Sequence, residues 1–514
     1  MDLLLVNANV ATMNPLQPRA SWVALGSGKI LSLGGPDNSS PQGSCHVEMI
    51  DCRGRTLVPG FIDSHIHLLS LAESFVTLDL RPECGTRSIA DIQSKIRALS
   101  EVTPRGAWIR GRGYNEFHLM EKRHPVRRDL DEAAPDHPVK LTHRSGHAHV
   151  LNTLALKRTG IAMETPEPPG GIIDRDLDTG LPSGLLYEMG ELLSMYIPPL
   201  EISEVEKGMK LANRELVSSG ITTLHDASFH NDEKRWALFR SYKDRGLLDP
   251  RLDMMFGFRS FHKKERNGPM THRNPNQLRV KGVKILLDET TGRLYPSQQE
   301  LDEMVFRVHQ SGMQAAIHAI EENAIESACN AIEKAFERLP RADHRHRIEH
   351  CSVCPPSLTK RIADMGVVVV SQPAFIYYHG DRYLKTVEDR QIEHLYPFGS
   401  LIRAGIRMAG SSDCPYAPLN PFSAMSAAVS RKTQSNEWIN RSEGVPVMDA
   451  LRMYTEFGAY AAFSEGEKGS ISPGKLADLV LLERDPTTTP PDEIKDIKVE
   501  MTVIDGNIVW DRRP

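Results

Sequence analysis

The chain has no long hydrophobic run and no strong charge of either sign. No window of its 514 residues approaches the 18 or so uninterrupted apolar residues that a membrane-spanning helix needs. The formal net charge of −5 provides neither the basic patch typical of nucleic-acid binding nor an acidic tail. We therefore expect a small-molecule substrate as the partner, and neither nucleic acid nor a membrane.

Cysteine is also scarce, with seven scattered residues. Cys351 and Cys354 form a C-x-x-C pair, but the chain has no second pair that would complete a zinc ribbon. An odd, scattered set favours a reducing, cytoplasmic setting. The apolar start MDLLLVNANV lacks the basic region and cleavage site of a signal peptide, so it indicates a strand. The oligomeric state stays open, with a homodimer as one option.

Eight apolar segments alternate with helical stretches through the middle of the chain. Helical patterns cover residues 203–220, 297–312 and 322–339, and the second begins with Ser297 and Glu300 at capping-box spacing. The eight apolar segments are residues 56–67, 220–227, 250–258, 280–288, 313–319, 347–352, 366–373 and 406–413. This alternation, with nearly continuous apolar strands, predicts an α/β fold of the (β/α)8 TIM-barrel type.

Two regions depart from a bare barrel. About 150 residues separate the first two predicted strands, far more than one crossover helix requires. We predict an inserted subdomain there, at about 78–203, lying over the barrel mouth. Short alternating strands with glycine turns at 1–57 and 467–514 predict one small β-sandwich domain built from both termini. The barrel itself is then expected at 58–466.

Two histidines one residue apart, His65 and His67, end the first predicted strand in PGFIDSHIHLLS. This spacing puts both imidazoles on one face of a strand. With 20 histidines, about 0.8 H-x-H pairs are expected by chance, and the chain has three. The others are His147 with His149 in the insertion and His344 with His346 before the sixth strand. Position along the barrel strands must therefore decide between the pairs.

Further residues of metal-ligand type stand at or near the carboxyl ends of other predicted strands. They are Lys284 in the fourth strand, His318 ending the fifth, His350 ending the sixth and Asp413 ending the eighth. Barrels of this type carry their chemistry at that end. Imidazole and carboxylate suit Zn²⁺, which lowers the pKa of a bound water to about 7. A lone buried histidine is more often a core residue, but this ordered set favours a metal site.

Together these motifs resemble the amidohydrolase superfamily, and in particular its YtcJ-like branch, amidohydrolase family 3, which includes N-substituted formamide deformylases. The matching stretches are PGFIDSHIH, GVKILLDET, AAIHAIEENAI, RIEHCS and GSSDCP. The segments LDEAAPDHPVKLTHRSGHAHVLNTLALKRTGI, GITTLHDA and KGSISPGKLADLVLLERDP also match. The resemblance therefore covers nearly the whole chain.

The resemblance implies a site for two divalent metals, expected to be zinc. The implied ligands are His65, His67 and Asp413 for one metal, and His318 and His350 for the other. Lys284, carboxylated on its amine, would bridge the two metals. A carbamate offers two anionic oxygens to a cation, whereas a plain ammonium would repel it.

The expected reaction is hydrolysis of a C–N bond, most simply a carboxamide bond, by metal-activated hydroxide. Asp413 would act as a catalytic residue that takes a proton from the nucleophile and returns it to the departing nitrogen. Ester or lactone hydrolysis needs the same nucleophile and stays open. A mononuclear deaminase on the same scaffold is a further alternative, against which Lys284 argues. A non-catalytic interaction protein is disfavoured because the ligand types are all retained.

Candidates for contacts with the substrate are weaker. His147 is a candidate oxyanion donor, with a structural histidine as the competing interpretation. Arg293 and Tyr295 follow the fourth strand and are candidates to contact the substrate, although solvated loop residues are more common there. Tyr377 and Tyr378 follow the seventh strand and are candidates to line a pocket, although aromatic residues there also serve in packing.

Overall fold

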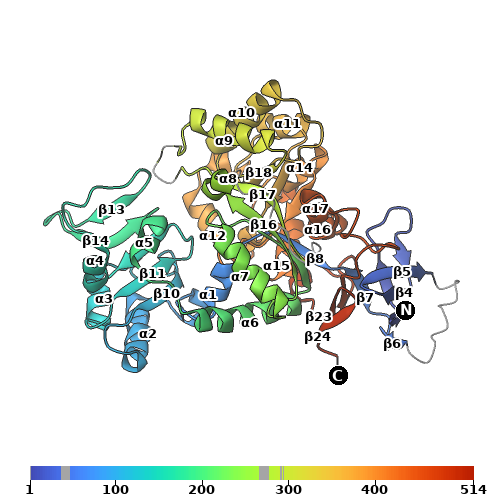
Figure 1. Ribbon diagram of the computed structural model, residues 1–514, viewed down its shortest axis with the longest axis horizontal. Helices are drawn as coiled ribbons and strands as arrows, with labels where there is room; N and C mark the ends of the chain where they lie inside the picture. Colours follow the sequence, from blue (N-terminus) through green and yellow to red (C-terminus); the bar gives the residue numbers. More distant parts are fainter. Residues whose placement is uncertain (1, 36–46, 265–276, 290–291, 293, 514) are drawn as a thin grey trace. The chain divides into compact units, whose positions relative to one another are not determined.

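The apolar segments in the middle of the chain form one eight-stranded sheet in which neighbouring strands are parallel (Figure 1). The computed structural model describes residues 2–35, 47–264, 277–289, 292 and 294–513. In spatial order, which follows the chain, the strands are β8 (Phe61–Ile66), β15 (Ile221–Asp226), β16 (Arg251–Gly257), β17 (Leu278–Leu286), β18 (Gln314–Ala319), β19 (Arg347–His350), β20 (Val368–Ser371) and β21 (Met408–Gly410). The predicted α/β barrel is therefore confirmed.

Backbone hydrogen bonds between the first strand and the segment after the last one bring the ends of the sheet together. The Asp413 N–H donates to the His65 carbonyl at 2.9 Å, and the His67 N–H donates to the Cys414 carbonyl at 3.0 Å. Every residue of β15, β16, β19 and β20 is buried, as expected for parallel strands covered on both faces. The result is a nearly closed barrel whose first and last strands meet at the predicted site.

Helices follow the barrel strands as the sequence pattern predicts. The capping box of α9 is formed, since Ser297 Oγ accepts from the Glu300 N–H and the Glu300 carboxylate accepts from the Ser297 N–H. The helices are α6 (Ile202–Ser218), α7 (Glu233–Asp244), α8 (Phe258–Lys264), α9 (Gln298–Gln310), α10 (Glu322–Arg338), α11 (Pro356–Asp364), α12 (Ala374–Thr386), α13 (Asp389–Ile392), α14 (Phe398–Arg403), α15 (Pro421–Ser430), α16 (Val447–Met453) and α17 (Glu456–Ala461). Within the described part of the chain, no helix has the length and apolarity to cross a membrane.

Strands from the two ends of the chain share a sheet. The six-stranded sheet has the order β24 (Asn507–Asp511), β23 (Val499–Ile504), β22 (Leu479–Leu482), β7 (Thr56–Pro59), β2 (Asn9–Ala11) and β3 (Arg19–Ala20). A four-stranded sheet has the order β5 (Lys29–Gly34), β4 (Trp22–Gly26), β1 (Leu3–Val6) and β6 (Glu48–Asp51). Alternate residues of both sheets, such as Leu3 and Leu5 or Leu479 and Leu481, enter one common core. The two sheets therefore pack as a sandwich.

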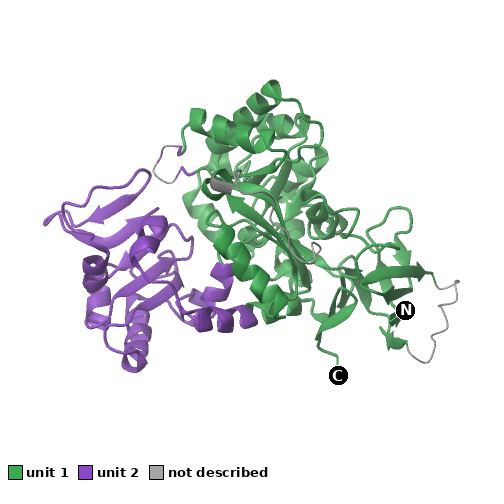
Figure 2. Cartoon of the chain, in the orientation of Figure 1, with its two compact units in different colours: residues 1–68, 212–287, 296–514 green, residues 69–211, 288–295 purple. Residues whose placement is uncertain are grey.

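The chain passes directly from this sandwich into the barrel. Gly60 separates β7 from β8, and a Cβ atom there would lie 2.2 Å from Thr222 Oγ1. Only glycine permits this close approach of β8 to β15. Residues 1–68, 212–287 and 296–514 form one compact unit, so the domain boundaries expected at 57 and 467 stay predictions (Figure 2).

Residues 69–211 and 288–295 form the second compact unit (Figure 2). Its mixed sheet has the order β13 (Ile172–Arg175), β14 (Pro182–Tyr187), β12 (Ala148–Leu151), β11 (Val139–His143), β10 (Ile109–Tyr114) and β9 (Leu78–Asp79). Its helices are α1 (Leu68–Ser74), α2 (Ile89–Val102), α3 (Arg127–Ala133), α4 (Thr153–Thr159) and α5 (Gly190–Tyr196). Ile92 and Ile96 of α2 pack with Leu141 and Val150 of the sheet in a separate core. The placement of this insertion over the barrel mouth stays a prediction.

Candidate metal centre

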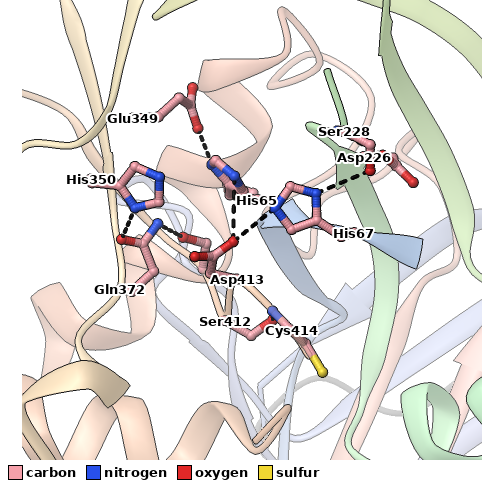
Figure 3. A network of polar contacts seen from close by, with 12 residues as sticks. His65, His67, Asp226, Ser228, Glu349, His350, Gln372, Ser412, Asp413 and Cys414 are labelled. Atoms are coloured by element: carbon pink, nitrogen blue, oxygen red, sulfur yellow. Dashed lines mark hydrogen bonds and ion pairs between the residues drawn. The ribbon is translucent and has the colours of Figure 1, made fainter. Parts of the chain in front are cut away.

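Three of the predicted ligands converge where β8 and β21 end. His65 lies near the end of β8, His67 follows it, and Asp413 lies three residues beyond the end of β21. The Oδ1 atom of Asp413 lies 3.0 Å from His67 Nε2 and 3.6 Å from His65 Nε2 (Figure 3). Ligand atoms of all three residues lie within 4.8 Å of one another. This is the distance range over which one cation can be bound by three side chains.

Two more predicted ligands lie beside this group. The His350 ring centroid is 5.0 Å from that of His65 and 4.4 Å from that of His318. His318 and His350 come from the neighbouring strands β18 and β19, where Ala319 pairs with His350. Four imidazoles and one carboxylate are therefore grouped at the carboxyl end of the barrel.

Lys284 on β17 is buried, with 2% of its surface exposed. Its Nζ atom has no hydrogen-bond partner among the described residues. Burial lowers the pKa of the amine to about 8, although the negative charges of Glu349 and Asp413 act in the opposite direction. An unpaired buried amine is costly, and a lowered pKa increases the neutral fraction that can react with carbon dioxide. Lys284 thus fits the predicted carbamate.

The backbone is strained where the ligands are presented. His350, Cys351 and Asp413 have φ angles of 73°, 51° and 56°, in the left-handed region that non-glycine residues seldom adopt. Asp63 braces the Asp413 loop, because its carboxylate accepts from the Ser412 N–H at 3.0 Å and from the Ser412 hydroxyl at 2.5 Å. The fold thus holds unfavourable backbone angles at the ends of β19 and β21, as functional sites often do.

Burial opposes ionisation of Asp413, but the hydrogen bond from His67 and the electrostatic effects of His65 and His350 outweigh it. Together they lower the pKa of Asp413 below the ordinary range. This carboxyl group is therefore ionised at neutral pH. A buried carboxylate surrounded by imidazoles is a donor set suited to a divalent cation.

Each of three imidazoles has a polar partner on its Nδ1 atom. The distances are 2.5 Å from His65 to Glu349 Oε2, 3.0 Å from His67 to Ser228 Oγ and 2.9 Å from His350 to Gln372 Oε1 (Figure 3). Such partners fix the ring and leave Nε2 for a metal. Glu349, Ser228 and Gln372 were not among the residues predicted from the sequence. Their positions in the sequence could have indicated them, because Glu349 directly precedes the predicted ligand His350, and Ser228 and Gln372 follow strands of the same barrel.

Tyr416 is a further residue beside the site that was not predicted from the sequence. Its ring meets the His67 ring edge-on, with centroids 5.3 Å apart, and its N–H donates to the Asp413 carbonyl at 2.9 Å. The predicted pair Tyr377 and Tyr378 lies on α12, with ring centroids 5.0 Å apart. Tyr378 is 3.4 Å from the Ser423 hydroxyl, to which it donates. The substrate contacts of Tyr377 and Tyr378 stay predictions.

His147 and Tyr295, two other predicted substrate contacts, belong to the second compact unit. His147 Nδ1 lies 2.7 Å from Glu188 Oε1, and 36% of the His147 side chain is exposed. Tyr295 is 45% exposed, and its N–H and carbonyl pair with Asp288. Arg293 lies outside the described residues. The roles of His147 and Tyr295 toward a substrate stay predictions.

Comparison with known proteins identifies the family. The model of the amidohydrolase family matches residues 48–510. The chain is 30% identical to an N-substituted formamide deformylase of Arthrobacter pascens, over 99% of this chain and 98% of that protein. It is also 30% identical to YtcJ of Bacillus subtilis (strain 168), an amidohydrolase by name, over 91% of this chain and 92% of that one.

The fold has a solved counterpart in an uncharacterized metal-dependent hydrolase of Pyrococcus horikoshii. The TM-score is 0.75 at 23% sequence identity, and the match covers 95% of this chain and 99% of that chain. This likeness supports the barrel architecture, while the sequence matches establish the relationship. The chain therefore belongs to the amidohydrolase family of hydrolases.

Proposed function

We propose that the chain hydrolyses the C–N bond of a small N-substituted carboxamide, with N-substituted formamides as the first class to test. The observation that carries this proposal is the grouping of His65, His67 and Asp413, with His350 5.0 Å from His65 between ring centroids. The similarity to the formamide deformylase, which extends over nearly the full length of both chains, supports the choice of substrate.

The proposed site holds two divalent cations, which we expect to be zinc. Their ligands would be His65, His67 and Asp413 for one cation, His318 and His350 for the other, and the Lys284 carbamate for both. The residues fit this role because the imidazole Nδ1 atoms of His65 and His350 have polar partners while Lys284 Nζ has none among the described residues. When bound, the cations supply Lewis-acid polarisation of the carbonyl and lower the pKa of water.

Asp413 would move the proton during the reaction. Hydrolysis adds the oxygen of water to the carbonyl carbon, breaks the C–N bond and leaves one proton on the departing nitrogen. Asp413 is ionised and buried, so its carboxylate would take a proton from the attacking water and deliver it to that nitrogen. The same carboxylate oxygen lies 3.0 Å from His67, which fixes its position during both steps.

The test is a comparison of amide, ester and lactone substrates with the purified protein and its Asp413→Asn variant. We expect N-substituted formamides to be cleaved, and the variant to lose at least about 100-fold in rate because the proton carrier is gone. Asp364→Asn is the matched control, since Asp364 pairs with Lys360 on the exposed face of α11. Cleavage of esters but not amides, or an active Asp413→Asn protein, would refute the proposal.

A further inference from the structure

A buried ion pair lies behind His65, on the ring edge that faces away from Asp413. Arg347 and Glu349 both belong to β19, and their exposed fractions are 1% and 0%. The guanidinium contacts both carboxylate oxygens, with Nε 2.6 Å from Oε1 and Nη2 3.0 Å from Oε2. The charge of each group is therefore balanced by the other in the barrel interior.

The carboxylate of this pair contacts His65 directly. Glu349 Oε2 lies 2.5 Å from His65 Nδ1 (Figure 3). An ionised carboxylate can only accept hydrogen bonds, so the proton of the neutral imidazole must be on Nδ1. The lone pair of His65 is then on Nε2, the nitrogen 3.6 Å from Asp413. Glu349 thus selects the tautomer that can bind a metal beside Asp413.

Arg347 also fixes the strand that carries His65. Its Nη2 atom donates to the Ser64 carbonyl at 2.7 Å, one residue before His65. Its Nη1 atom lies 3.3 Å from Nδ1 of His225, a buried residue of β15. One guanidinium therefore links β19 to the backbone of β8 and to the side chain of β15. This arrangement holds the His65 ring at both its backbone and its Nδ1 atom.

Burial of an ion pair costs desolvation energy that apolar residues of similar size would avoid. The pair is therefore poorly explained by stability alone. Its carboxylate is also distinctive, because His67 faces a serine hydroxyl and His350 faces a glutamine amide at the equivalent atom. A carboxylate partner makes an imidazole a stronger ligand than a neutral partner does.

We infer that Glu349 and Arg347 are positioning residues that orient His65 and make it a stronger imidazole ligand of the proposed metal site than His67 or His350. This inference rests on the proposed function, since it assigns the pair a role toward the proposed metal. It predicts that removal of the Glu349 charge weakens metal binding even where the fold and the ligands are intact.

The test measures Zn²⁺ affinity of the full chain by competition with a chromogenic chelator. Glu349→Gln is expected to bind Zn²⁺ about 10- to 100-fold more weakly than the wild-type protein. The visible absorption of the Co²⁺-substituted protein should also change, because the His65 ligand is altered. Glu443→Gln is the matched control, since Glu443 is a buried carboxylate that accepts from the Ser400 N–H and hydroxyl. Its affinity and spectrum should equal those of the wild type.

Unchanged Zn²⁺ affinity and an unchanged Co²⁺ spectrum in folded Glu349→Gln would overturn the inference. Should that variant fail to fold, Arg347→Lys is measured in the same way, and normal affinity there would overturn it equally. A wild-type chain that binds no metal would refute the inference together with the proposed site. A wild-type chain that binds metal but cleaves no amide would refute the proposed reaction alone, and the loss of affinity in Glu349→Gln would still support the positioning role.

Discussion

The pairs His65–His67 and His344–His346 have the same spacing but lie at opposite ends of barrel strands. The first pair ends β8, and both Nε2 atoms face the Asp413 carboxylate at 3.6 Å and 3.0 Å. The second pair precedes β19, and its nitrogens are used by the backbone and by another histidine. Equal spacing therefore does not make equal sites. The partners of the ring nitrogens decide which pair is available to a metal.

The hydrogen bonds of the second pair show a structural role. His346 Nδ1 accepts from the Ala315 N–H at 2.9 Å, so its Nε2–H donates to His309 Nδ1 at 2.8 Å. His344 Nδ1 accepts from the His346 N–H, and its Nε2–H donates to the Met365 carbonyl at 2.8 Å. Both rings are thus neutral and fully bonded. They join the starts of β18 and β19 to neighbouring helices.

The largest effect is expected when a histidine of the first pair is replaced, because this should abolish hydrolysis. His67→Ala should lower amide hydrolysis to below about 1% of the wild-type rate, because a ligand and the partner of Asp413 are both removed. The melting temperature of the metal-free protein should change little, since His67 is partly exposed. Rates and thermal melting of both proteins check this. Wild-type activity in His67→Ala would remove the distinction between the pairs.

His346→Ala should have the opposite result. Loss of this ring leaves the Ala315 N–H and His309 Nδ1 without the His346 partner, which we expect to cost about 3 kcal/mol of unfolding free energy. The metal content per folded chain should equal that of the wild type. Urea unfolding and elemental analysis provide the two readouts. A loss of metal without a loss of stability would show that the second pair has been misinterpreted.

A smaller effect, on the free energy of unfolding, is expected when the pH is lowered. Burial lowers the pKa values of His344 and His346 below the ordinary histidine value near 6.5. Their neutral forms therefore stabilise the fold above pH 6.5, and this stability is lost as the pH falls toward the folded-state pKa values. Each histidine contributes a slope of up to about 1.4 kcal/mol per pH unit. Urea unfolding of the wild type from pH 7 to 5 should show a steeper loss than His346→Ala, and equal slopes would contradict this assignment.

The third pair, His147–His149, should give the smallest effect on the reaction. His147→Ala is expected to lower kcat about tenfold, or about 1.4 kcal/mol of barrier, if the ring donates to the substrate carbonyl. Metal content should be unchanged. Glu188→Gln is the companion variant, because Glu188 is the partner of His147 at 2.7 Å. A wild-type kcat in His147→Ala would leave this histidine with a structural role only.

The barrel is well predicted from the sequence because the patterns that indicate its strands and helices are local and recur along the chain. Nearly continuous apolar segments, such as the one that forms β20, alternate with helical patterns, and capping residues such as Ser297 and Glu300 set helix starts. The order of ligand types on the strands then predicts one common end for them. The structure brings His65, His67 and Asp413 together there as expected.

The remaining features depend on contacts between distant residues. Glu349 lies 284 positions after His65, and only the closed barrel brings the two side chains together. The sheet of the insertion mixes parallel and antiparallel pairs, so its strands lack the regular rhythm of the barrel. The left-handed backbone at His350 and Asp413 was also not predictable, because neither position is a glycine, the residue that usually indicates this conformation. These features could not be predicted from the sequence, because they depend on the tertiary structure.

The most direct measurement is the metal content per chain of protein purified without chelator, compared with Lys284→Ala. We expect about two divalent cations per wild-type chain and one or none in the variant, because the buried amine would bridge the two as a carbamate. One cation that is unaffected by the substitution would favour a mononuclear site and a deaminase reaction. A wild-type chain without metal would contradict the proposed metal site.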